Sequence, residues 1–397
     1  MHARAAKFPV GAGATLDELE SDPHPLLARL REREPVSWLP VLGCWLVTER
    51  ELALHVMREP ATYTVDDPRF STGQVVGPSM LTLDGDEHRR HRDPFARAFR
   101  LDAVRTRFTA LVEDETDRLV GAIERDGRAD LRRSVAGPLA VAVVAHALGL
   151  ANTDVGNVLS WYETIVEGVT RVTAGEPIPD EAPAAFAALR ASIEPSLDSD
   201  PGSSLLAAAA GDAAELTHTE VVSNAAVLMF GGIETTEGMI ANGLLHLLSH
   251  PDQLELAEAE PALLRNGVEE SLRLEPAAAV IDRYATQDIE LAGAEVRARE
   301  LVRISIAGAN RDPRVFADPD RFDVGRENAK LHLAFAHGPH VCIGMHLARL
   351  EAHTAIGRLL DRLPGLRLDP ARPSAARGLV FRKPPTLHVV WEARTQS

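Results

Sequence analysis

The residues best suited to chemistry lie near the C-terminus, in the stretch Phe335–His346, FAHGPHVCIGMH. One of the chain's two cysteines, Cys342, lies there between Gly338 and Gly344. A thiolate is a good metal ligand, and the glycines allow a bulky group to approach the backbone closely. Residues 343–363 have the pattern of an amphipathic helix, whose N-terminus would favour a negatively charged sulfur. The stretch therefore predicts a thiolate held at a helix N-terminus.

Three kinds of site are compatible with this stretch. Such a thiolate suits the axial position of a haem iron. A buried, inert thiol is the commonest state of a single cysteine. A small zinc or copper site is also compatible, with ligands from His337, His340, Cys342 and His346. The stretch by itself leaves these three alternatives open.

A second segment, Val221–Leu248, is apolar on nearly all sides and predicts a buried helix, yet residues 231–236, GGIETT, interrupt it. Glycines weaken a helix locally, and a threonine hydroxyl can donate to a preceding carbonyl, which opens a groove for dioxygen and a water. Alternatively, one helix ends at the glycines and Thr235 or Thr236 caps the next. The apolar pattern continues beyond the glycines, which favours one bent helix.

Two shorter pairs have helical spacing. Glu270 and Arg273 lie three residues apart in VEESLRLEP, an arrangement that most often forms an ordinary surface ion pair. His88 and Arg92 lie four residues apart, on one face of a helix, and could bind an anionic group. Alternatively, they belong to a solvated basic face.

Composition narrows the classes of function. The 397 residues are 45% hydrophobic, which is ample for a large core, and the net charge of −16 argues against nucleic acid or anionic lipid as partners. Cys44 and Cys342 are far apart, so we expect no disulfide framework and a reducing, cytoplasmic location. The N-terminus has no apolar signal region. The most membrane-like stretch, residues 135–151, is short and interrupted by Pro138, so it predicts a buried helix.

Helical patterns dominate the chain, for example over residues 102–124. Strand patterns are short and local, at residues 36–48, 289–306 and 379–392. The Ala-rich region 175–215 predicts a loosely packed helix–loop–helix that could serve ligand entry. The sequence thus predicts a mainly α fold with small sheets.

Taken in order, the four segments resemble the cytochrome P450 family, over nearly the whole chain. The cysteine stretch is similar to the family signature F-G-x-G-x-[HR]-x-C-x-G, with Ala336 standing where glycine is usual. The mid-chain helix resembles the [AG]-G-x-[DE]-T motif, and residues 309–326 look like the family's stretch before the cysteine. The residues that match the motifs are Phe335, Gly338, His340, Cys342 and Gly344, then Gly231, Gly232, Glu234 and Thr235, and finally Glu270 and Arg273 of the E-x-x-R pair.

The resemblance implies one prism-shaped, mainly helical haem domain over residues 1–397 with a small β region, and we expect flexible tails at about 1–13 and 393–397. It implies haem b as cofactor, Cys342 as the iron ligand, Glu234 and Thr235 as catalytic residues that deliver protons, and Glu270 with Arg273 as a structural clamp. The remaining cofactor-binding residues implied are His88, Arg92, Arg283 and His340 at the propionates, with Phe335 and Gly344 beside the haem.

By resemblance, the substrate pocket draws on residues 63–83, the Ala-rich region, the helix ahead of Gly231, and the run Ala277, Ala278, Ala279, Val280 and Ile281. This run is small and apolar, which predicts a small, largely apolar organic substrate. Asp282 or Thr64 could orient it. The family reaction would insert one oxygen atom from dioxygen, by hydroxylation or oxidative demethylation.

The sequence contains no flavin or iron–sulfur module, so the resemblance implies electrons from a ferredoxin and its NAD(P)H-dependent reductase. Acidic ferredoxins need a basic face, or else the same charges are a solvated helix. The arginines available are Arg89, Arg90, Arg92, Arg97, Arg100, Arg105 and Arg107, with Arg349. The alternative functions are a peroxide-driven peroxygenase, which the Glu234–Thr235 pair counts against, and a non-catalytic haem- or metal-binding protein.

Overall fold

The computed structural model describes residues 2–150, 155–173, 177–197, 205–211 and 216–393. At its centre lies α13 (His218–Ser249), a continuous helix that runs through residues 231–236 without a break. Thr217 caps it in a capping box: the Thr217 hydroxyl accepts from the Glu220 amide, and the Glu220 carboxylate accepts from the Thr217 amide. The alternative in which one helix ends at the glycines is therefore wrong.

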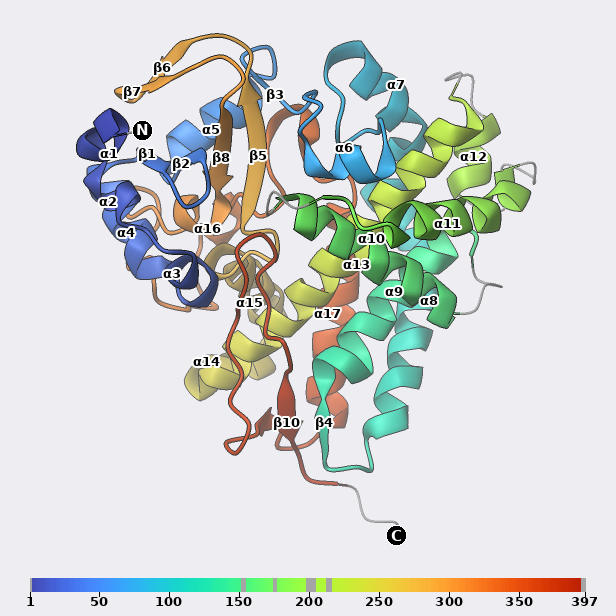
Figure 1. Cartoon of the computed structure of the whole chain (residues 1–397). Coiled ribbons are helices and arrows are strands. Elements are labelled where there is room, and N and C mark those ends of the chain that lie inside the picture. The colour runs from blue at the N-terminus through green and yellow to red at the C-terminus, as the bar shows by residue number, and fades with distance from the viewer. Residues whose placement is uncertain (1, 151–154, 174–176, 198–204, 212–215, 394–397) are drawn as a thin grey trace.

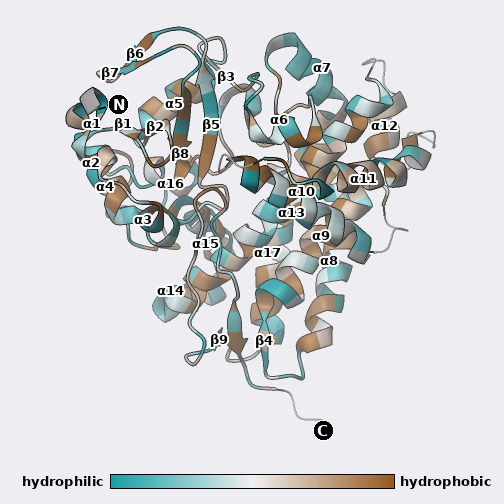
Figure 2. Cartoon of the chain, viewed as in Figure 1, coloured by the Kyte–Doolittle hydropathy of each residue, from teal (hydrophilic) through white to brown (hydrophobic). Residues whose placement is uncertain are grey.

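The helical part surrounds α13, with α8, α9 and α10 to α12 on the right of Figure 1 and α17 behind the centre. Its helices have the following bounds: α6 (Ser71–Val76), α7 (Gly85–Ala96), α8 (Leu101–Ile123), α9 (Gly137–Ala147), α10 (Val155–Thr173), α11 (Glu181–Leu197), α12 (Leu205–Gly211), α14 (Pro251–Ala259), α15 (Pro261–Leu274) and α17 (Met345–Arg362). The helices predicted over 102–124, 135–151 and 343–363 are α8, α9 and α17. In Figure 2, α8 carries many hydrophobic residues and α7 is mostly hydrophilic.

A five-stranded sheet of order β1-β2-β8-β5-β3 lies to the left in Figure 1, next to the N-terminal helices. Its strands pair antiparallel except β2 with β8. The elements of this part are α1 (His2–Lys7), α2 (Pro9–Ala12), α3 (Leu16–Ser21), α4 (His24–Arg33), β1 (Val36–Leu39), β2 (Cys44–Val47), α5 (Arg50–Arg58), β3 (Tyr63–Thr64), β5 (Val280–Ala285), β8 (Leu301–Ser305) and α16 (Ile306–Ala309).

Two smaller sheets complete the fold. They are the three-stranded sheet of β4 (Arg128–Asp130), β10 (His388–Val390) and β9 (Arg367–Leu368), and the hairpin of β6 (Ile289–Leu291) and β7 (Ala294–Val296). The predicted mainly α fold with small sheets is confirmed. No helix in the described parts of the chain is long and apolar enough to cross a membrane.

The chain termini differ in part from expectation. Residues 2–13, expected to be a flexible tail, form α1 and α2 and pack onto the sheet: Phe8 lies edge-on to Trp45, and Arg4 pairs with Glu300 at 2.6 Å. The burial of Phe8 explains the order of this segment. Residues 394–397 lie outside the described residues, as do 174–176, 198–204 and 212–215 of the Ala-rich region.

Glu270 and Arg273 form a buried pair on α15 instead of a surface pair, since both side chains are 0% exposed. Arg273 donates twice to the Glu270 carboxylate, at 2.7 and 2.8 Å, and also to the carbonyl of Pro319. Arg326 donates to Glu270 from the other side, at 2.9 Å. The pair thereby ties α15 to residues 310–326, the segment that leads to the cysteine stretch.

The turn before α17 has an unusual backbone. Ala336 has φ +57° and Gly338 has φ +75°, in the left-handed region that favours glycine. A side chain at Gly338 would also place its Cβ 2.5 Å from the carbonyl oxygen of Met57. The Cys342 amide closes the turn by donating to the Phe335 carbonyl at 2.8 Å. The departure at Ala336 thus leaves the turn in place but puts an alanine in a strained conformation.

We predict that Arg273→Met lowers the free energy of unfolding by about 3–5 kcal/mol, because it leaves the Glu270 carboxylate buried with fewer partners. The measurement is the urea midpoint of the purified full chain. Arg297→Gln is the control, since its partners Asp288 and Glu295 are 60% and 70% exposed and its midpoint should change little. Equal midpoints for the two variants would contradict a structural clamp.

We predict that Ala336→Gly raises the free energy of unfolding by about 0.5–1 kcal/mol, because relief of the positive φ outweighs the added chain entropy of glycine. The control is Ala110→Gly, on the exposed face of α8, which should lower it by about 1 kcal/mol. If both variants lose stability, the alanine is not strained.

Candidate functional site

A cavity of about 360 Å³ lies between α13 and the turn that carries Cys342. Gly231 and Thr235 line it from α13, and Cys342 and Gly344 line it from the start of α17. Phe335, His340, Arg92 and Arg283, which were predicted to bind the cofactor, also line it. Three of the four segments singled out in the sequence therefore meet at one cavity, while the Glu270–Arg273 pair lies outside its wall.

The Cys342 side chain is half-buried and faces the cavity, and its removal from bulk water raises the pKa of the thiol above the ordinary value. The Gly344 amide and the positive charges of Arg92 and Arg349 oppose this shift. A bound metal cation removes the thiol proton outright, so the site needs a metal to hold the sulfur as a thiolate. Phe335 shields the turn, with the Arg349 guanidinium 4.5 Å from its ring centre.

Two arginines in the cavity wall, the buried Arg283 and the half-buried Arg92, have no carboxylate partner among the described residues. The Arg283 side chain donates only to the neighbouring Asp282 carbonyl, and burial lowers its pKa to about 10. Arg92 donates to the Val341 carbonyl at 2.6 Å, and burial also lowers its pKa. Among the described residues neither one forms an ion pair, so both have positive charge available for an anionic group in the cavity.

Two histidines stand beside these arginines. His88 is buried with its Nε2 atom unpartnered, and burial lowers its pKa to about 4. Its ring centre lies 4.3 Å from that of His340, whose Nε2 atom is 2.8 Å from the Asp84 carboxylate. Burial by itself would raise the Asp84 pKa, but hydrogen bonds from His340, Thr64 and the Val65 amide lower it to about 2.

These features fit haem. The unpartnered His88 nitrogen and the unpaired Arg92 and Arg283 suit its two propionates, and Cys342 in the wall suits its iron. The zinc or copper alternative lacks a site, because no group of three or more metal-ligating side chains gathers in the described ranges.

On α13, the two predicted catalytic residues point in different directions. Thr235 lines the cavity and donates from its hydroxyl to the Gly231 carbonyl at 2.5 Å. Gly231 has open space beside it, whereas a Cβ on Gly232 would lie 2.7 Å from Val144. Glu234 is buried outside the cavity wall, where it accepts from the Tyr162 hydroxyl and pairs with Lys383 at 2.6 Å.

The predicted pocket run lies mostly in the wall: Ala277, Ala278, Val280 and Ile281 line the cavity. Ala279 does not, and its assignment to the pocket is corrected here. Its amide donates to the Val380 carbonyl, its carbonyl accepts from the Ile306 amide, and its side chain packs with the apolar cluster around α4 instead.

Two further polar residues are already paired within the protein. The Thr64 hydroxyl donates to Asp84, and Asp282 accepts twice from Arg303, at 2.7 Å each. Because both side chains already form hydrogen bonds within the protein, few of their donor and acceptor sites are left to orient a substrate.

Sequence reasoning missed Lys383, Tyr162 and Glu351. Glu351 lines the cavity from α17, its Oε2 atom has no partner, and burial raises its pKa well above the ordinary value. A charged residue in an amphipathic helix usually faces water, so the sequence pattern of α17 did not indicate that Glu351 lines the cavity. Lys383 and Tyr162 lie far from Glu234 in sequence, and only folding brings the three together.

Comparison with known proteins agrees with this geometry. The Cytochrome P450 family profile matches residues 259–387. Cytochrome P450 monooxygenase PikC of Streptomyces venezuelae is 35% identical over 90% of this chain and 88% of its own. Nocardicin C N-oxygenase of Nocardia uniformis is also 35% identical, over 94% and 97%. The solved structure of CalO2 is 30% identical, covers 96% of this chain and 98% of its own, and has a TM-score of 0.86. The chain belongs to the cytochrome P450 family of haem-thiolate monooxygenases, which bind haem b and incorporate molecular oxygen.

Proposed function

We propose that this enzyme inserts one oxygen atom from dioxygen into a small, neutral, largely apolar organic substrate, by hydroxylation or oxidative demethylation. Electrons would come from a ferredoxin and its NAD(P)H-dependent reductase, and the chain would work as a single haem domain in the cytoplasm. The observation that supports this most is the cavity itself, which has Cys342 on one side, Thr235 on the other and apolar side chains around both.

When bound, haem supplies the iron at which dioxygen is activated. The chain's own residues would hold it: Cys342 as ligand, and His88, Arg92, Arg283 and His340 at the propionates. Charge-assisted hydrogen bonds to those carboxylates would give the buried arginines the partners that they lack. The apolar wall would keep bulk water away from the reacting atoms.

Thr235 and Glu234 would deliver protons to the cavity. The Thr235 hydroxyl uses its hydrogen on the Gly231 carbonyl, so its oxygen faces the cavity as an acceptor that can hold a water or a protonated oxygen. The open space at Gly231 leaves room for that molecule. Glu234, one residue earlier, would carry protons to this point from its buried position beside Tyr162 and Lys383.

The substrate should be neutral, because the charged residues in the described wall already have other roles. Arg92, Arg283 and His340 stand where the propionates would lie, and Asp282 pairs with Arg303. Burial raises the pKa of the Glu351 carboxyl well above its ordinary value, which favours its neutral form. The polar groups left for a substrate are hydroxyls, those of Ser71 and Thr72 on α6 among them.

Relatives support the class of reaction but not one substrate. At similar identity they include a Vitamin D(3) 25-hydroxylase from Pseudonocardia autotrophica (32%) and Nocardicin C N-oxygenase (35%), whose names point to unlike molecules. A peroxygenase remains the alternative function, and the acid–alcohol pair on α13 weighs against it.

For electron transfer, the basic face is smaller than the sequence suggests. Arg89 pairs with Asp86, Arg90 with Glu87 and Glu220, and Arg349 with Glu269. Arg92 points into the cavity and the Arg107 guanidinium lies over Phe108.

Three exposed arginines remain, namely Arg97, Arg100 and Arg105, and none of them forms an ion pair within the described part of the chain. Leu101, 45% exposed, lies among them. Burial lowers the pKa of His346, and the nearby positive charges of Arg349 and Arg105 lower it further. Because His346 is only four residues after Cys342, this face lies on the cysteine side of the cavity. We propose it as the ferredoxin docking surface.

The proposed function predicts substrate turnover that requires dioxygen, NADPH, a ferredoxin and its reductase. Neutral apolar compounds would first be screened by the change in haem absorption on binding, and products of the best binders would be analysed with labelled dioxygen. Label in the product supports the proposal. Turnover with hydrogen peroxide and none with the ferredoxin system would favour the peroxygenase.

We predict that Thr235→Ala lowers the fraction of electrons that end in product by about tenfold, with released peroxide making up the difference, because the cavity loses its acceptor for a protonated oxygen. Thr235→Ser keeps the hydroxyl and should retain most coupling. Product and peroxide are measured per NADPH consumed. Unchanged coupling in Thr235→Ala would remove the residue from proton delivery.

We predict that Arg100→Glu and Arg105→Glu each weaken ferredoxin binding about tenfold at low salt, with a smaller effect at high salt. Arg297→Glu, at an exposed pair beyond β7, is the charge-matched control and should change little. Binding is measured by titration at two salt concentrations. Equal effects for all three variants would show a response to net charge only.

A further inference from the structure

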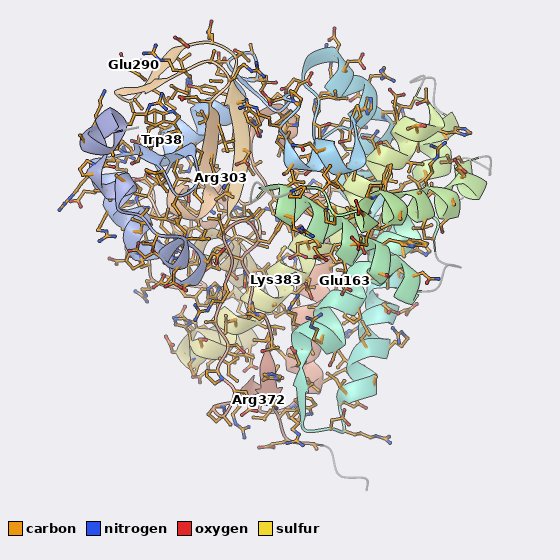
Figure 3. The ribbon with its side chains drawn as sticks, in the orientation of Figure 1. Trp38, Glu163, Glu290, Arg303, Arg372 and Lys383 are labelled. Atoms are coloured by element: carbon orange, nitrogen blue, oxygen red, sulfur yellow. The ribbon has the colours of Figure 1, made fainter. Side chains whose placement is uncertain are left out.

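The segment between α6 and α7 carries a turn, from Ser79 to Thr82, that forms part of the cavity wall. Its two central residues, Met80 and Leu81, both line the cavity. The Ser79 carbonyl accepts from the Thr82 amide at 3.0 Å, and the Ser79 amide donates to the Thr82 hydroxyl at 2.9 Å. Figure 3 shows α6 and α7 to the right of Arg303, which lines the cavity from β8. The two bonds shape the turn, but they do not fix its position against the rest of the wall.

A side chain of α13 fixes that position. The Oδ1 atom of Asn224 accepts from the Met80 amide at 2.8 Å, and the two residues are 0% and 4% exposed. A buried backbone amide without a partner is costly, so this bond favours one placement of the turn. Asn224 is not among the residues described in the cavity wall, so it can influence a bound molecule only through the turn.

A histidine of α7 orients the Asn224 amide group. The Nδ2 atom of Asn224 donates to the Glu220 carbonyl at 2.9 Å and lies 3.0 Å from Nδ1 of His91. Because the Met80 amide can only donate, the Asn224 oxygen must face it, and the NH2 group must face His91. His91 Nδ1 is then an acceptor, and a neutral ring carries its hydrogen on Nε2, 3.4 Å from the Glu220 carboxylate.

The surroundings of His91 favour this neutral ring. The side chain is 1% exposed, and burial lowers its pKa, although the Glu220 carboxylate opposes the shift. Arg90, 3.2 Å from His91 Nε2, lowers the pKa further and pairs with the same carboxylate. A continuous series of hydrogen bonds thus leads from Glu220 through His91 and Asn224 to the Met80 amide.

We propose that Asn224 and His91 are positioning residues for substrate binding, which hold the Met80 amide and so fix the Met80 and Leu81 side chains in the cavity wall. This inference rests on the proposed function, in which the substrate occupies this cavity. His91 orients Asn224, Asn224 holds the turn, and the turn contacts the substrate. Neither positioning residue touches the substrate itself.

The test measures binding of imidazole and of 1-octylimidazole to the haem-loaded full chain, by the change in haem absorption. Both probes bind iron through the same ring, so the ratio of their dissociation constants reports contacts of the octyl chain with the wall. We expect Asn224→Ala to lower the preference for 1-octylimidazole about tenfold, because the turn no longer keeps one position. Amide hydrogen exchange of residues 77–84 should become faster.

A double-mutant cycle shows whether Asn224 acts through the turn. Met80→Ala should lower the same preference, and adding Asn224→Ala to it should cost much less than a further tenfold. If Met80→Ala leaves the preference unchanged, or if the two losses multiply in full, Asn224 does not act through Met80 and the inference is wrong.

Three further variants make the result specific. His91→Asn can keep an acceptor near the place of Nδ1 and should retain most of the preference, whereas His91→Phe should act like Asn224→Ala to a smaller extent. Asn266→Ala is the matched control: its amide donates to the carbonyls of Val324 and Arg326, outside the described wall. It should leave the preference unchanged even where it lowers stability. Equal effects of Asn266→Ala and Asn224→Ala would overturn the inference, because they would indicate a general loss of stability.

Binding and oxygen insertion are measured separately, so the two levels of the argument can be distinguished. If Asn224→Ala leaves the preference unchanged while labelled oxygen from dioxygen still enters the product, the inference is wrong and the proposed function stands. If the preference falls as expected but no labelled product forms with the ferredoxin system, the turn is held as inferred and the proposed function fails.

Discussion

The structure depends on one constraint: a cysteine sulfur must stay deprotonated in a buried, largely apolar cavity. Burial works against this, since it raises the pKa of the Cys342 thiol. The iron of haem resolves the conflict, because metal coordination removes the proton. The rest of the cysteine stretch then has clear tasks: a turn with two positive φ angles presents the sulfur, and Gly344 is the N-cap residue of α17.

The same constraint orders the charges around the cavity. At one edge lie Arg92 and Arg283, which form no ion pair among the described residues, and His88, whose Nε2 atom has no partner; we propose that the haem propionates bind there. Two of the carboxylates near the cavity are paired within the protein: Glu234 lies outside the wall and pairs with Lys383, and Asp282 lines the wall but pairs with Arg303. Glu351 also lines the wall, and burial raises the pKa of this carboxyl well above its ordinary value. The rest of the wall is mainly apolar, which suits a neutral substrate and a reaction from which water is excluded.

Features that depend on local sequence were predictable, and features that depend on distant contacts were not. The amphipathic pattern of α17 and the apolar run through α13 place Cys342 and Thr235 on their helices. Charge alone could not reveal that Glu270 and Arg273 are fully buried, because their partners lie 37 to 56 residues away, from Asn310 to Arg326. Likewise, counting arginines overstated the basic face, since pairing with Asp86 and Glu220 is set by the fold.

The most direct test of the central claim is the absorption spectrum of the purified, dithionite-reduced protein with carbon monoxide, recorded for the wild type and for Cys342→Ser. A Soret band strongly shifted to the red in the wild type, and absent in Cys342→Ser, is the expected result for haem held by the Cys342 thiolate. A wild-type band at the position typical of histidine-ligated haem, or no Soret band in protein supplied with haem, would contradict it.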